Sequence, residues 1–165
     1  KPACPRPKSR SMPDTLHLRP YTPDDLAACL QIWRDASEAG HPFLTAADLD
    51  ADAAMVRDMY IPAAEMTLAC DGARVVGFVA LLGQFIGGLF VDPIHHRRGI
   101  GRRLLQAAAE RHGPLTVEVY AANTRAMAFY ENLGFHETSR RATDDQSRPL
   151  PVIWMEQPGA TPQSA

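Results

Sequence analysis

Residues 88–105 have the sequence Gly-Leu-Phe-Val-Asp-Pro-Ile-His-His-Arg-Arg-Gly-Ile-Gly-Arg-Arg-Leu-Leu, in which an apolar run gives way to a basic turn that contains glycine. Apolar residues then recur at helical spacing, at Ile100, Leu104 and Ala108. The first N–H groups of a helix lack intrahelical partners and carry the positive end of its dipole, and glycine lets an anion approach the backbone. The stretch therefore predicts a phosphate-binding turn between a strand and a helix.

The composition is that of one ordinary globular domain. The chain has 165 residues, of which 45% are hydrophobic and 22% are charged, and its 17 basic and 19 acidic side chains leave a formal charge of −2. So small a net charge creates no field that favours nucleic acid or a membrane surface, and the basic turn has to act locally. Because no apolar run has the length of a membrane span or the form of a signal peptide, we expect a cytoplasmic protein with neither partner.

The two ends of the chain differ from its middle. Residues 1–13 are rich in Pro, Lys and Arg and have no periodicity, so we expect a disordered leader or an expression remnant there. We expect residues 14–157 to form a single domain and residues 158–165 a flexible tail. The three cysteines, Cys4, Cys29 and Cys70, have no paired spacing, which argues against a disulfide framework or a zinc site and for a reducing compartment.

Hydrophobic periodicity predicts the element order βααβββαβαββ. We expect strands near residues 15–19, 66–70, 74–82, 89–91, 115–120, 135–141 and 151–156, and helices near residues 22–40, 45–61, 99–112 and 123–133. The strand, helix and strand over residues 89–120 predict a right-handed crossover between parallel neighbours. The predicted fold class is mixed α/β, with a parallel pair at the centre of the sheet and helices on both faces.

Two segments of the chain resemble the GCN5-related N-acetyltransferase (GNAT) superfamily. His96-Arg-Arg-Gly-Ile-Gly101 resembles the acyl-coenzyme A signature of these enzymes, and residues 115–123 followed by residues 128–135 resemble their second conserved segment. The nearest resemblance is to small bacterial members without an assigned substrate. It implies a mostly antiparallel sheet with one splayed parallel strand pair. It also implies acetyl-coenzyme A as co-substrate, an amine acceptor, no metal, and a monomer or homodimer.

The same resemblance implies which residues hold the coenzyme. The main chain of Leu89, Phe90 and Val91 would pair with the pantetheine arm as an added strand. The pyrophosphate would lie over the turn, which consists of His96, Arg97, Arg98, Gly99, Ile100, Gly101 and Arg102. The family's turn usually begins with Gln or Arg where this chain has His96, and the neighbouring arginines can supply the charge. Asn123 is assigned either to coenzyme contact or to capping the next helix.

Acetyl transfer from a thioester needs a neutral amine, a polarised carbonyl and a protonated leaving thiolate. A lysine-like amine has a pKa of about 10, so a base has to remove a proton before the attack. Tyr130 occupies the family's general-acid position and can protonate the thiolate. The alternative for Tyr130 is a packed helix tyrosine whose hydroxyl is bonded to the backbone. A main-chain N–H of Phe90 or Val91 can stabilise the oxyanion.

The general base is the open assignment, because the strand before the turn contains no carboxylate. Glu118 is one candidate, since its surroundings resemble those of a glutamate base in the ribosomal-protein alanine acetyltransferases. The alternative for Glu118 is a sheet-face glutamate that pairs with an arginine or faces solvent. His41, between the first two helices, is the other candidate, and its alternative is an ordinary helix-terminal histidine.

The sequence leaves the acyl acceptor unspecified. Four apolar side chains either line an amine pocket or belong to the core, namely Trp33, Phe43, Met55 and Met59. We expect direct acetyl transfer to a primary amine of a small molecule, a peptide or a protein. The alternative function is an acyl-coenzyme A sensor with weak or no catalytic activity.

Overall fold

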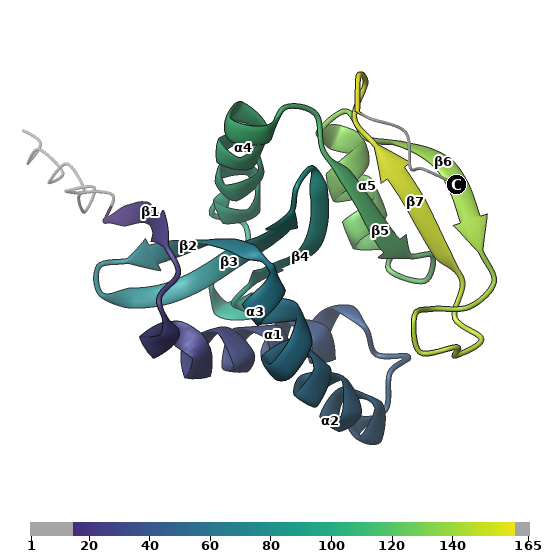
Figure 1. Ribbon diagram of the computed structural model, residues 1–165, viewed down its shortest axis with the longest axis horizontal. Helices are drawn as coiled ribbons and strands as arrows, with labels where there is room; N and C mark the ends of the chain where they lie inside the picture. Colours follow the sequence, from purple (N-terminus) through teal and green to yellow (C-terminus); the bar gives the residue numbers. More distant parts are fainter. Residues whose placement is uncertain (1–14, 161–165) are drawn as a thin grey trace, which may run out of the picture.

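The computed structural model describes residues 15–160 as a seven-stranded sheet with helices on both faces (Figure 1). The strands are β1 (Leu16–Pro20), β2 (Glu65–Asp71), β3 (Arg74–Leu82), β4 (Phe85–Val91), β5 (Thr116–Tyr120), β6 (His136–Arg141) and β7 (Val152–Glu156). Their order across the sheet is β1-β2-β3-β4-β5-β7-β6, and β4 and β5 form the one parallel pair within residues 15–160. The predicted mixed, mostly antiparallel sheet is confirmed.

Helices connect the strands at the predicted places. They are α1 (Leu26–Gly40), α2 (Ala46–Met55), α3 (Ile61–Ala63), α4 (Ile100–His112) and α5 (Thr124–Asn132), with a π-helical turn at Val56–Tyr60 and 3-10 turns at Pro23–Asp25 and Pro93–His95. Two predicted starts are confirmed by side-chain caps: Thr45 accepts the N–H of Asp48, and Asn123 accepts the N–H of Ala126 at 3.1 Å. None of the helices in residues 15–160 has the length and apolarity that a membrane span requires.

The sheet separates two apolar clusters. On one face, α4 and α5 pack their side chains against Val117 and Val119 of β5. On the other face, α1 and α2 pack against β2 and β3, and Tyr120 of β5 belongs to that second cluster. Because side chains alternate along a strand, Glu118 and Tyr120 face the α1 side while the two valines face the α4 side. The strand β5 thus presents polar groups to one face only.

The parallel pair is short. Phe85 is opposite Thr116 and Ile86 is opposite Val117, after which the strands diverge, although β4 continues to Val91 (Figure 1). A register shift in the pairing of β3 with β4 leaves Gly87 as an extra residue, and this forms a β-bulge. Beyond Ile86 the main chain of β4 therefore has no strand partner on its β5 side.

Some element boundaries were predicted wrongly. The strand β4 begins at Phe85 and not at Leu89, because Gly87 and Gly88 mask the strand pattern in the sequence. The second helix does not end before Pro62, since a π turn leads into α3, where proline is tolerated in the first turn. Tyr60, at the end of this π turn, is 43% exposed.

The structure describes little of the two terminal segments that were predicted to lie outside the domain. Residues 1–13, the expected leader, lie outside the described residues, as do residues 161–165 of the expected tail. The last described residues form a turn in which the N–H of Ala160 donates to the carbonyl of Gln157 at 3.1 Å.

Candidate active site

The predicted phosphate turn joins β4 to α4. Gly99 caps α4 in a left-handed conformation, with φ at +73°, and a Cβ at this position would have nothing within 4 Å. The buried Asp92 begins the turn, where its carboxylate accepts the N–H of Ile94 at 3.1 Å and contacts Arg74 at 3.3 Å. Open space thus lies before the N-terminus of α4, as an anion site requires.

The side chains of the turn differ in what they contact. Arg98 pairs with Asp71 at 3.0 Å, whereas Arg97 and Arg102 have no ion-pair partner within residues 15–160. His96 Nε2 donates to the carbonyl of Val91 at 3.1 Å, so its ring faces β4 and not the helix N-terminus. Arg97 and Arg102 are consequently the arginines of the turn that are available to an anion.

The second glycine of the turn serves packing. A Cβ at Gly101 would lie 3.2 Å from Cζ of Phe129 on α5 and 3.8 Å from Leu89 on β4. Ile100, between the two glycines, is buried among the side chains of the α4 face. Gly99 therefore has the open surroundings expected for ligand approach, while Gly101 lets α4 lie close to α5 and β4.

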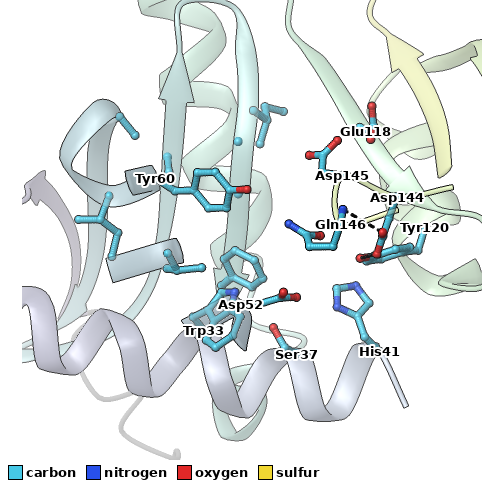
Figure 2. A pocket seen from close by; sticks show the side chains of 18 of the residues that line it. Trp33, Ser37, His41, Asp52, Tyr60, Glu118, Tyr120, Asp144, Asp145 and Gln146 are labelled. Carbon is cyan, nitrogen blue, oxygen red and sulfur yellow. Dashed lines mark hydrogen bonds between the residues drawn. The ribbon is translucent and has the colours of Figure 1, made fainter. Parts of the chain in front are cut away.

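A cavity of about 360 Å³ lies on the α1 side of the sheet (Figure 2). Its lining includes apolar side chains of α1, α2, β3 and β4, among them Trp33, Leu49, Phe78 and Phe90. Its polar side chains come from α1 and the residue after it, from α2 and the π turn, from β5 and from the loop 142–151, and they include Ser37, His41, Asp52, Tyr60, Glu118, Tyr120, Asp144, Asp145 and Gln146. The lining contains four carboxylates and no Lys or Arg side chain, and it reaches β4 at Gly87 and Gly88.

Glu118 stands one residue beyond the last parallel pair, at the edge of this cavity. Its carboxylate accepts a hydrogen bond from Arg141, which also pairs with Asp145 at 2.8 Å. The side chain is 21% exposed. The arginine pair expected of a structural glutamate is thus present, and the same carboxylate lines the cavity where the two parallel strands separate.

His41 follows α1 and packs between two aromatic rings. Its ring centroid lies 5.5 Å from that of Phe43 and 5.1 Å from that of Tyr120. Burial disfavours the charged imidazole and lowers the pKa of His41 to about 4. The imidazole is therefore neutral at neutral pH, and burial opposes the positive charge that it would acquire by accepting a proton. Of the two predicted bases, His41 is therefore the weaker candidate.

Tyr130 lies on the opposite face of the sheet, in α5. The side chain is 6% exposed, and its ring contacts Phe129 and Phe135 edge to face, each at 5.2 Å between centroids. Its hydroxyl has no hydrogen-bond partner within residues 15–160, so no backbone contact accounts for it. Burial raises the pKa of Tyr130 well above its ordinary value and keeps the hydroxyl protonated at neutral pH.

Sequence reasoning missed the part of the site that loop 142–151 contributes. The carboxylate of Asp144 is buried and accepts the hydroxyl of Tyr120 at 2.8 Å. Arg148 reaches from the same loop to Asp52 of α2 at 2.6 Å. The only local signal was a polar stretch between two strands. Of the four aromatic and methionine side chains predicted to line a pocket or belong to the core, Trp33 lines the cavity, whereas Met59 is 59% exposed.

Comparisons with known proteins identify the family of this chain. The family model described as an acetyltransferase (GNAT) domain matches residues 62–137. The peptidyl-lysine N-acetyltransferase YiaC of Escherichia coli strain K12 is 34% identical over 137 residues, which are 82% of this chain and 94% of YiaC. This chain belongs to the GNAT family of N-acetyltransferases.

Solved structures of GNAT proteins share the fold of this GNAT enzyme. The solution structure of apo-form YjaB from Escherichia coli has a TM-score of 0.79 and 31% identity, and the match covers 88% of this chain and 99% of YjaB. The PaiA N-acetyltransferase of Thermoplasma acidophilum, solved in complex with coenzyme A, has a TM-score of 0.71 and 16% identity, with coverage of 86% and 98%. The predicted GNAT fold with its splayed parallel pair is confirmed.

Proposed function

We propose that this GNAT enzyme transfers the acetyl group of acetyl-coenzyme A to the amine of a lysine side chain in a protein or peptide. One observation carries the proposal: the phosphate turn and the acidic cavity lie at the same gap between β4 and β5. A thioester held along β4 can meet an amine that enters from the cavity. The name of YiaC, a peptidyl-lysine N-acetyltransferase, supports lysine as the acceptor.

In this proposal, the coenzyme is bound mainly by main-chain groups. Beyond Ile86, the strand β4 has no partner strand on its β5 side within residues 15–160, and the pantetheine amides can add to it as a strand. The pyrophosphate then reaches the N-terminus of α4 at Gly99, near Arg97 and Arg102. The coenzyme A complex of the Thermoplasma neighbour supports a coenzyme in this fold.

The amine acceptor, in contrast, is recognised by side chains of the cavity. Four carboxylates line the cavity and attract an ammonium group, while the apolar lining suits the methylene stem of a lysine. Arg141 and Arg148 pair with these carboxylates from outside the lining, but the acids outnumber them. The cavity is therefore suited to a cationic amine and not to an anionic acceptor.

The transfer follows from these positions. Glu118 accepts a proton from the ammonium group, directly or through a water molecule, and the freed nitrogen lone pair forms a C–N bond to the acetyl carbon. A main-chain N–H of Phe90 or Val91 stabilises the oxyanion. When the oxyanion collapses and the C–S bond breaks, the hydroxyl of Tyr130 gives its proton to the sulfur and regains one from solvent. The positively charged nitrogen loses its second proton to water, which leaves a neutral amide. A thiolate in the same dry site also binds protons more tightly, which offsets the raised pKa of Tyr130.

Thiol release tests the proposed function. The protein is incubated with acetyl-coenzyme A and a lysine-containing peptide, a polyamine or an aromatic amine, and free thiol and acetylated product are followed by absorbance and mass spectrometry. We expect the fastest release with the peptide and an acetyl group on its lysine Nε. Tight coenzyme binding without thiol release above hydrolysis, for all three amines, would contradict the proposal and favour an acyl-coenzyme A sensor.

A further inference from the structure

An ion-pair network fastens loop 142–151 to α2. The side chain of Arg148 is 15% exposed, and its guanidinium donates to both carboxylate oxygens of Asp52, at 2.6 and 3.0 Å. The guanidinium also lies 3.4 Å from a carboxylate oxygen of Asp48 and 3.4 Å from one of Asp144. Three carboxylates from two elements thus surround one half-buried cation, a geometry that favours arginine over lysine.

Asp144 gives the loop its shape. One carboxylate oxygen accepts the N–H groups of Gln146 and Arg148, at 3.0 and 2.9 Å, and the other accepts the hydroxyl of Tyr120 at 2.8 Å. The N–H of Asp144 in turn donates to the carbonyl of Arg148 at 3.1 Å. With both oxygens satisfied and its side chain 3% exposed, Asp144 is a structural hub of the loop and not a contact for a ligand.

The fastened loop forms one wall of the acceptor cavity. Asp145 and Gln146 line the cavity from this loop, and Figure 2 shows them facing it opposite Tyr60. Asp145 shares Arg141 with Glu118, so the position of the loop affects the surroundings of the proposed base. Gln146 also contacts the sulfur of Met55 on α2, at 3.7 Å.

We propose that Arg148 is a positioning residue for the acceptor, which holds loop 142–151 against α2 and so fixes the cavity wall that the amine faces. The inference rests on the proposed function, because it takes the cavity as the amine site. Arg148 does not itself line the cavity, so its effect passes through Asp52, Asp144 and the loop. Without the guanidinium, buried carboxylates on the loop and on α2 would face each other uncompensated, and their repulsion would part the two elements.

Steady-state kinetics with a lysine peptide test this role. We expect Arg148→Met to raise the peptide KM about tenfold or more while the acetyl-coenzyme A KM changes less than about twofold, because only the acceptor wall moves. Arg148→Lys should have an intermediate effect, since an ammonium group cannot reproduce the two-pronged contact. Asp52→Asn, added to Arg148→Met, should restore part of the peptide KM because it removes an uncompensated carboxylate.

The matched control is Arg140→Met, which removes an exposed arginine that pairs with Glu137 on the same hairpin. It should leave both KM values unchanged. An unaltered peptide KM in Arg148→Met, or equal rises in both KM values, would overturn the proposal. If Arg148→Met does not fold, as judged by thermal unfolding, Arg148→Lys with and without Asp52→Asn provides the same comparison.

Hydrogen exchange separates this inference from the proposed function. The N–H of Gln146 donates to Asp144 inside the fastened loop, so we expect its exchange to be at least about tenfold faster in Arg148→Met and unchanged in Arg140→Met. If no amine is acetylated by the unaltered protein but exchange accelerates as expected, the proposed function fails and the fastening of the loop stands. Unchanged exchange of Gln146 overturns the inference even in an active enzyme.

Discussion

The phosphate turn and the acceptor cavity lie at the same strand gap, yet they are built in different ways. The turn is one continuous segment, and it offers helix N–H groups, a left-handed glycine and two arginines that have no ion-pair partner among the described residues. The cavity is assembled from α1, α2, β5 and loop 142–151, which are distant in sequence. Under the proposed function, backbone geometry holds the coenzyme that the whole family shares, whereas the acceptor meets side chains that only the tertiary fold brings together.

The strongest expected effect is on the phosphate turn. Gly99→Asp places a carboxylate in the open space before α4, where it repels a pyrophosphate, so we expect acetyl-coenzyme A affinity to fall by more than about 100-fold in calorimetry. Gly99→Asn, of the same shape without the charge, should bind better than the aspartate variant. Gly83→Asp controls for strain, since Gly83 also has a positive φ and open surroundings, and it lies at the opposite end of β4 from the phosphate turn. Normal affinity in Gly99→Asp would refute the anion site.

On the cavity side, Glu118→Gln should leave coenzyme affinity intact and lower kcat for the lysine peptide by about 100-fold or more, because an amide cannot accept the proton. Stopped-flow thiol detection measures the rate. The matched control is Glu137→Gln on β6, where the carboxylate also pairs with an arginine but does not line the cavity. Equal rates for the two variants would show that Glu118 is a structural ion-pair partner only.

Tyr130 tests whether the two regions meet at one reaction centre. Tyr130→Phe should lower kcat by about 10- to 100-fold and change acetyl-coenzyme A affinity by less than about twofold, since only the proton donor is lost. The melting temperature should not fall, because the hydroxyl has no protein partner to lose within residues 15–160. A large drop in coenzyme affinity or in melting temperature would show that the hydroxyl is structural.

The smallest expected effect is on stability. It shows whether His41 is a buried neutral imidazole or a proton acceptor in catalysis. Burial lowers the pKa of His41 in the folded protein to about 4, whereas its pKa in the unfolded chain is about 6.5. Between about pH 6.5 and pH 4, the unfolded chain therefore binds more protons than the folded protein does. The free energy of unfolding should therefore fall as the pH drops through this window, by up to about 3 kcal/mol, and be unaffected by His41 above it. Urea unfolding at pH 7 and pH 5 measures the change.

His41→Gln should remove this part of the pH dependence, whereas His17→Gln, at an exposed position on β1, should not. An unchanged slope in His41→Gln would mean that the imidazole is not held neutral by burial. A large loss of kcat in His41→Gln at pH 7, with stability retained, would return His41 to the role of proton acceptor.

The same contrast explains what the sequence could predict. Thr45 and Asn123 cap helices as expected, because a cap depends on residues only three positions apart. The start of β4 was missed because two glycines interrupt its pattern. The contact of Arg148 with Asp52 spans 96 residues, and nothing in the local sequence of either residue indicates it.

The candidate catalytic residues divide in a similar way. The identities of Tyr130 and Glu118 came from a family resemblance, but the surroundings that decide their chemistry come from the tertiary structure. The pairing of Glu118 with Arg141 joins β5 to β6, and the burial of Tyr130 needs α5 to pack against the sheet. Nothing next to Glu118 in the sequence indicates Arg141, and Phe129, next to Tyr130, accounts for only one of the two ring contacts of Tyr130.

The proposed function requires coenzyme and lysine to meet through the gap that opens beyond Ile86 and Val117. The most direct measurement is a crystal structure with a bisubstrate analogue, in which an acetyl bridge joins the sulfur of coenzyme A to Nε of a lysine peptide. We expect the pyrophosphate at the N-terminus of α4, the bridge between β4 and β5, and the lysine stem in the cavity beside Glu118. A lysine bound on the α4 face, or a bridge that does not pass between the two strands, would contradict the claim.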